Sequence, residues 1–195
     1  MPQRMGSPFQ FGQAVLEPIV QPVYDRATYT AATPNGTLRF FVDVAAKTER
    51  DIFPGITSGG QLSAPRLAVV YGIRLAYSED VAVATGGVDL TNLLYNSFYR
   101  FHVGVKDYAV GPAFWFPAGL GTSGFAATTT AATDLGTSTN GVPAFFSRFS
   151  IEKRKIAIPP QQAFFGELVT AGAAALTEDR DVWNILDSEF GYEVQ

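Results

Sequence analysis

The stretch RKIAIPPQQAFFGELV, residues 154–169, places two adjacent prolines between two runs of β-prone residues. Proline donates no backbone hydrogen bond, so within sheets it is confined to edges, bends and bulges. Pro159 and Pro160 therefore predict a corner, where a strand leaves one sheet and the chain turns into another. A chain that needs such a corner is typical of a fold with two packed β-sheets.

Residues 66–78, RLAVVYGIRLAYS, show the clearest alternation of large apolar residues with small or polar ones. A period of two predicts a long strand with one buried face. The same alternation predicts strands over residues 37–45 and 98–105. The expected buried face of the long strand consists of Leu67, Val69, Tyr71, Ile73, Leu75 and Tyr77.

The rest of the pattern also favours an all-β chain. Residues 145–158 change the parity of their apolar positions, which a β-bulge produces. Residues 88–98 favour one or two helical turns with Asp89 as the N-cap, and residues 181–195 suit either a helix or strands. We count about seven to nine short strands that do not alternate with helices, a pattern typical of a jelly-roll β-sandwich or barrel with long loops.

Residues 1–36 are predicted to form an extended N-terminal arm, because their five prolines block helices and interrupt strand ladders. The arm is nevertheless apolar, so it lies either along its own domain or on a neighbouring subunit. Residues 37–195 are expected to form one jelly-roll domain, with a loop insertion of small residues at about 118–143. The candidate interface residues in the arm are Phe9, Phe11, Leu16, Ile19 and Val20.

The composition excludes several classes of function. The net charge is −4 and the one basic run is short, so direct nucleic-acid binding is not expected. The chain has no cysteine, which excludes disulfide frameworks, thiolate zinc sites and cysteine catalysis. No apolar run approaches the roughly 18 residues of a membrane helix. The first residues lack the apolar core of a secretory signal, so we expect a chain made without export.

Catalytic chemistry has few candidates in this sequence. His102 is the single histidine, and the nucleophile motif GxSxG that would accompany a Ser-His-Asp triad does not occur. Metal-binding cupins typically use two or three histidines and a glutamate, which one histidine cannot supply. Two acidic clusters, at residues 79–80 and 178–181, are better explained as solvated charges. We therefore predict no catalytic, cofactor-binding or metal-binding residue.

The opening stretch also resembles the late-strand pattern of single jelly-roll major capsid proteins from tailless icosahedral viruses of bacteria and archaea. In that family a strand runs into IPP or IPA, a polar pair follows, and an aromatic strand resumes. The closing residues 185–195, ILDSEFGYEVQ, are similar to the short final strand of the family. The matching residues in the opening stretch are Ile156, Ile158, Pro159, Pro160, Gln161, Gln162, Phe164, Phe165 and Leu168.

The resemblance implies a structural virion protein, a capsid subunit that self-associates through its arm, loops and barrel edges into an icosahedral shell. Pro159, Pro160, Gln161 and Gln162 are then further candidate interface residues. Because the arm carries no basic cluster, a shell over an internal viral membrane, or one with a separate genome-binding virion protein, fits better than direct genome packaging. The chain is expected in the virion, after assembly in the host cytoplasm.

Two other functions stay open. The first is a carbohydrate- or receptor-binding β-sandwich, such as a phage spike or fibre head, in which Trp115 with Phe114 and Phe116 stacks against sugar rings. Core packing is the favoured explanation of that aromatic cluster. The second is a glycosidase that places two carboxylates across a cleft.

Overall fold

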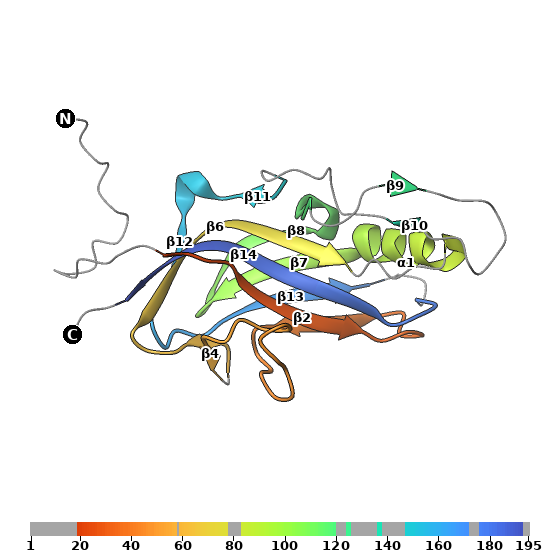
Figure 1. Cartoon of the computed structure of the whole chain (residues 1–195). Helices are drawn as coiled ribbons and strands as arrows, with labels where there is room; N and C mark the ends of the chain where they lie inside the picture. Colours follow the sequence, from red (N-terminus) through yellow and green to blue (C-terminus); the bar gives the residue numbers. More distant parts are fainter. Residues whose placement is uncertain are drawn as a thin grey trace.

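The computed structural model describes residues 19–57, 59–77, 83–119, 124–125, 136–137, 147–171 and 176–192. This part of the chain is mostly β, and its two large antiparallel sheets face each other and curl into a half-barrel, with one α-helix at one end (Figure 1). The prediction of an all-β chain is therefore confirmed. No helix in the described ranges is long and apolar enough to cross a membrane.

The first sheet consists of β1 (Ile19–Val20), β2 (Val23–Tyr29), β6 (Arg66–Tyr77), β11 (Phe149–Ser150), β12 (Ile156–Ile158) and β14 (Arg180–Tyr192). β14 and β6 pair with each other at its centre. The outer side of β14 pairs with β1 and β2. The outer side of β6 pairs with β11 and β12. The segment that suited either a helix or strands is thus β14, a strand that is paired on both of its sides.

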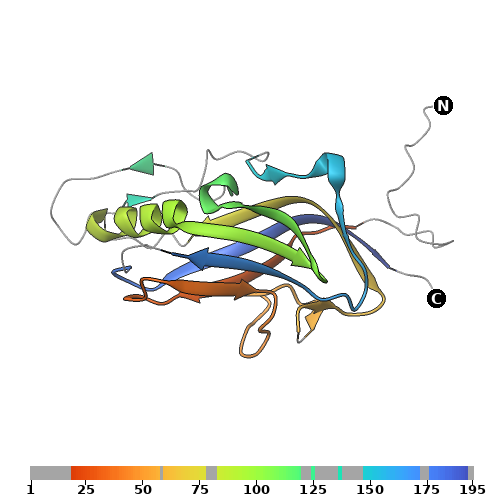
Figure 2. The same ribbon diagram turned by 180° about the vertical axis from the view of Figure 1, so that it is seen from behind.

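The second sheet, seen in front in Figure 2, consists of β3 (Gly36–Phe40), β13 (Phe164–Thr170), β7 (Ser97–Val103) and β8 (Lys106–Pro112), in that order. A helix, α1 (Val83–Asn96), leads directly into β7. Two short strand pairs complete the β-structure: β4 (Ile56–Thr57) with β5 (Gln61–Leu62), and β9 (Gly124–Phe125) with β10 (Gly136–Thr137). The 3₁₀ turns are η1 (Ala113–Trp115) and η2 (Glu152–Arg154).

Strand pairing is nested along the chain. β7 pairs with β8, β6 with β12, β3 with β13, and β2 with β14, so each pair encloses the previous one in sequence. The chain therefore crosses from one sheet to the other after each of these strands except at the β7–β8 turn. The link between Ile158, in the first sheet, and Phe164, in the second, is one of these crossings. The corner predicted from Pro159 and Pro160 is confirmed.

The hydrophobic core lies between the two sheets and is rich in aromatic rings. Phe164 packs on Phe41, with ring centroids 5.2 Å apart, and Tyr99 packs edge-on against Phe116 at 4.7 Å. All four side chains are fully buried. Burying one large apolar side chain contributes about 1.5–3 kcal/mol, so the aromatic residues supply much of the stability of this fold.

A β-bulge in β6 changes which residues face the core. Gly72 pairs with Asp187 while Val70 pairs with Ser188, so Tyr71 is the extra residue in β6. One extra residue reverses the faces of a strand beyond it. The buried face predicted from strict alternation is therefore correct only after the bulge. The core-facing residues of β6 are Ala68, Val70, Ile73, Leu75 and Tyr77, while Leu67 and Val69 pack with Ala157 in a separate small cluster.

Residues 19–36, predicted as part of the arm, contain two strands of the first sheet. β2 pairs with β14 along its whole length, and its Val23 and Asp25 are fully buried. The charge of Asp25 is compensated by Lys47, whose Nζ lies 2.6 Å from the Asp25 carboxylate. The prolines of this region flank β2, so they leave its ladder intact. Phe9, Phe11 and Leu16 lie outside the described residues.

Asp89 is not the N-cap of a short helix, because α1 begins six residues before it. Its carboxylate instead accepts hydrogen bonds from the backbone N–H and hydroxyl of Thr177, at 3.0 and 2.7 Å, and from the guanidinium of Arg180, at 3.1 Å. Asp89 therefore fixes α1 to the segment that enters β14. The bulge predicted within residues 145–158 is also absent from the described part, where η2 separates β11 from β12.

Candidate interaction surfaces

Large apolar side chains, here together called the aromatic patch, are exposed on α1, β7, β8 and η1, elements that contact one another. Its members are Tyr95, Phe98, Val110, Phe114 and Trp115. The turn η1 presents Phe114 and Trp115 outward while the next residue, Phe116, is fully buried. The rings of Phe114 and Tyr95 are 5.5 Å apart. The prediction that this aromatic cluster packs in the core is correct for Phe116. It is wrong for Phe114 and Trp115, whose side chains are 48% and 57% exposed.

The proline corner is a second exposed surface. Pro159 and Gln161 are exposed, and Pro160 and Gln162 are half-buried. Gln161 adopts a left-handed backbone with φ of 59°. The corner contacts the β7–β8 turn, where the N–H of Gly104 donates to the carbonyl of Ala163 at 2.8 Å. The corner and this turn together form a compact loop surface at one end of the half-barrel.

The edge at β1 is a third exposed surface. Ile19 and Val20 pair with Phe190 and Glu189 of β14, and both remain exposed, Val20 by 71%. β1 lies at the end of the molecule opposite α1 (Figure 1). The predicted interface residues within the described ranges are therefore distributed over separate surfaces.

His102 has a structural environment. Its Nδ1 lies 2.5 Å from the Oδ1 of Asp107, and its ring stacks on Phe165 with centroids 4.3 Å apart. The side chain is 15% exposed, more buried than the half-exposed position expected. Within the described ranges, no group of three histidine, aspartate or glutamate residues is placed to hold a metal ion.

The acidic residues at 178–181 have structural partners. Asp181 accepts hydrogen bonds from Arg26 and Thr28, at 2.9 and 2.6 Å, and Asp179 accepts one from the backbone N–H of Ala31 at 2.7 Å. Glu178 lies 3.3 Å from Arg180. These bonds connect the entry of β14 to β2 and the turn after it. The cluster at 79–80 lies outside the described residues.

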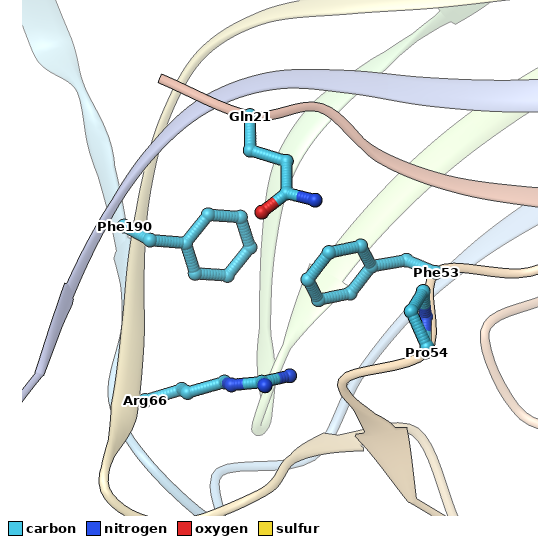
Figure 3. Close-up of a pocket in the computed structure, with 5 residues that line it drawn as sticks. All are labelled: Gln21, Phe53, Pro54, Arg66 and Phe190. Atoms are coloured by element: carbon cyan, nitrogen blue, oxygen red, sulfur yellow. The ribbon is translucent and has the colours of Figure 1, made fainter. Parts of the chain in front are cut away.

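A small pocket of about 80 Å³ opens beside the edge at β1 (Figure 3). Phe53 and Phe190 form its apolar walls, with rings stacked 5.0 Å apart at an interplanar angle of 20°. The guanidinium of Arg66 lies 5.9 Å from the centre of the Phe53 ring. Gln21 and Pro54 complete the lining. Sequence reasoning missed this pocket because its residues come from four separated segments and share no motif.

Comparison with known proteins adds no relative. No protein-family model, no curated protein and no solved structure matches the chain.

Replacing Trp115 with serine is expected to change the free energy of unfolding by no more than about 0.5 kcal/mol, because the side chain is largely exposed. The same change should weaken self-association, since a contact would bury the aromatic patch. Urea unfolding and sedimentation velocity measure the two effects. Phe116→Ala, in the buried neighbour, is the matched control and should mainly lower stability. Unchanged association in Trp115→Ser would exclude Trp115 from the contact.

Proposed function

We propose that this chain is a capsid subunit with a jelly-roll fold, which assembles with copies of itself into an icosahedral shell. The observation that carries the proposal is the nested strand pairing. The β2–β14 and β6–β12 pairs lie in one sheet, and the β3–β13 and β7–β8 pairs lie in the other. A double-sheet jelly roll, the architecture of many viral capsid domains, lectins and cupins, winds its strands in this way.

The distribution of exposed apolar residues supports a shell subunit over a module with one ligand. The aromatic patch lies by α1, and the edge at β1 and the proline corner, which follows β12, lie toward the opposite end of the molecule (Figure 1). A subunit in a closed shell must contact neighbours on several sides, through heterologous contacts that close by symmetry. A domain that only binds one ligand needs a single site.

The charge distribution supports a structural role without direct nucleic-acid contact. The chain carries a net charge of −4, and residues 1–18 contain only one basic residue, Arg4. A protein that packages a bare genome neutralises phosphates with clustered lysine and arginine. In the proposed virion, a separate genome-binding protein or an internal membrane lies beneath the shell, and assembly takes place in the host cytoplasm.

A carbohydrate-binding β-sandwich is the second candidate, favoured by the exposed ring of Trp115. Aromatic rings on a surface are suitable platforms for sugars. A glycan ligand would raise the melting temperature by binding the native state. Binding to a glycan array that is lost in Trp115→Ser, in a chain that stays monomeric, would favour this function over the capsid.

Deletion of residues 1–18 tests the capsid proposal. The shortened chain keeps β1 and β2, so we expect it to fold with a near-native melting temperature and to self-associate at least about tenfold more weakly. The expected loss reflects the apolar residues removed, which include Phe9, Phe11 and Leu16. Sedimentation velocity over a range of protein concentrations measures the change. Equal association of both chains would exclude this segment from the subunit contacts.

A further inference from the structure

The pocket in Figure 3 contains Arg66, for which the described residues supply no counterion. Within the described ranges, Arg66 forms no ion pair and its guanidinium donates no hydrogen bond, although the side chain is half-buried. The other partly or fully buried arginines of those ranges, Arg26, Arg74, Arg148 and Arg180, each pair with a carboxylate. Among the described residues, Arg66 is therefore a half-buried cation whose guanidinium N–H donors have no acceptor.

The local structure holds this cation at the pocket. The guanidinium stacks on Phe53, and a cation over an aromatic face is attracted by the ring quadrupole. Gly55 leaves space for both groups, because a Cβ at this position would clash with the Phe53 ring and with a guanidinium nitrogen of Arg66. Phe53 is fixed in turn by its N–H, which donates to the carbonyl of Tyr24 at 2.9 Å. The site is thus built before a ligand arrives.

The lining defines the chemistry of the ligand. A guanidinium binds a carboxylate through paired, charge-assisted hydrogen bonds. The Phe53 and Phe190 rings and Pro54 suit a short apolar group, and the side chain of Gln21 points toward the two rings (Figure 3). The pocket is small, about 80 Å³, so its ligand must be short. We propose that this pocket binds a carboxylate carried on a short apolar chain.

Two sources supply this chemistry. One is a free short-chain carboxylic acid. The other is a glutamate or aspartate side chain of a second copy of this chain, which has 18 such residues. This second source rests on the proposed function, since it places the pocket in a contact between subunits. The position of the pocket beside the exposed edge at β1 is suitable for such a contact.

Thermal unfolding with sodium butyrate tests the pocket, with butyramide as the uncharged control at matched ionic strength. Butyrate should raise the melting temperature and butyramide should not. Arg66→Gln should weaken butyrate binding about tenfold or more, because it removes charge-assisted hydrogen bonds. Arg100→Gln is the matched control, since Arg100 is exposed on β7, and it should bind butyrate like wild type. Equal shifts with acid and amide on the wild-type chain would overturn the proposal, even if Arg66→Gln fails to fold.

Sedimentation velocity with saturating butyrate separates the two sources. Release of smaller species by butyrate, matched by weaker association of Arg66→Gln, supports a carboxylate from a second copy. Unchanged sedimentation together with butyrate binding supports a free acid. Absence of butyrate binding overturns the pocket alone, because self-association of the unliganded chain still tests the capsid proposal.

Discussion

Replacing Phe164 with alanine is expected to lower the free energy of unfolding by about 3–5 kcal/mol. Phe164 is fully buried between the two sheets, and its ring lies 5.2 Å from Phe41 and 6.4 Å from Phe101. The truncation removes these contacts and leaves a cavity that packed sheets cannot close. Chemical denaturation followed by tryptophan fluorescence measures the loss, which is a large fraction of the total stability of a typical domain, about 5–15 kcal/mol.

Phe165→Ala is the matched control for this change. Phe165 is the next residue of β13 and lies on the outer face of the sheet, half-buried against His102 and under the guanidinium of Arg39. Its truncation should cost only about 1 kcal/mol. Similar losses for the two variants would contradict the assignment of inner and outer faces to the second sheet.

Replacing Asp89 with asparagine is expected to lower the free energy of unfolding by about 3–5 kcal/mol. Asp89 and Arg180 are both buried and lie 3.1 Å apart, so the change leaves the Arg180 guanidinium without its main counterion. Asp181→Asn is the control, because Asp181 pairs with the more exposed Arg26 and should cost about 0–1 kcal/mol. Thermal and urea unfolding of the two variants compare these losses. Equal losses would show that Asp89 does not anchor α1.

The same residue predicts a dependence on pH. Burial raises the pKa of Asp89, but the hydrogen bonds from Thr177 and Arg180 outweigh it, so the pKa lies below its ordinary value. A carboxyl whose pKa is lowered by folding stabilises the fold above its unfolded pKa of about 3.9. That contribution is lost as the pH falls through the folded pKa. When the pH is lowered from 5 through the folded pKa of Asp89, the free energy of unfolding should therefore fall less in Asp89→Asn than in the wild type. An equal fall in both proteins would contradict this role of Asp89.

The architecture could be predicted from local chemistry at some positions. Pro159 and Pro160 indicate a sheet-to-sheet corner because the missing N–H is a property of the residue itself. Alternation along residues 66–78 indicates a long strand for a similar reason. The nested pairing of the strands depends on contacts between distant segments, which local patterns do not predict. The only pointer to it in the sequence is the resemblance of the last quarter of the chain to jelly-roll capsid proteins.

Other features could not be predicted because they depend on distant partners. The face of β6 reverses at Tyr71, and the bulge exists only through the register with Asp187 and Ser188 of β14. The prolines around β2 predict an arm, and its pairing with β14, more than 150 positions further along, makes it a strand of the sheet. The pocket at Arg66 likewise combines segments that the fold alone brings together.

Electron microscopy of the purified full chain, across protein concentration and salt, tests the central claim most directly. If the chain is a capsid subunit, we expect closed shells or regular rings of subunits, in which the aromatic patch, the proline corner or the edge at β1 lies in contacts between copies. Separate monomers under every condition, at the highest concentration and at both low and high salt, would contradict self-assembly of this chain.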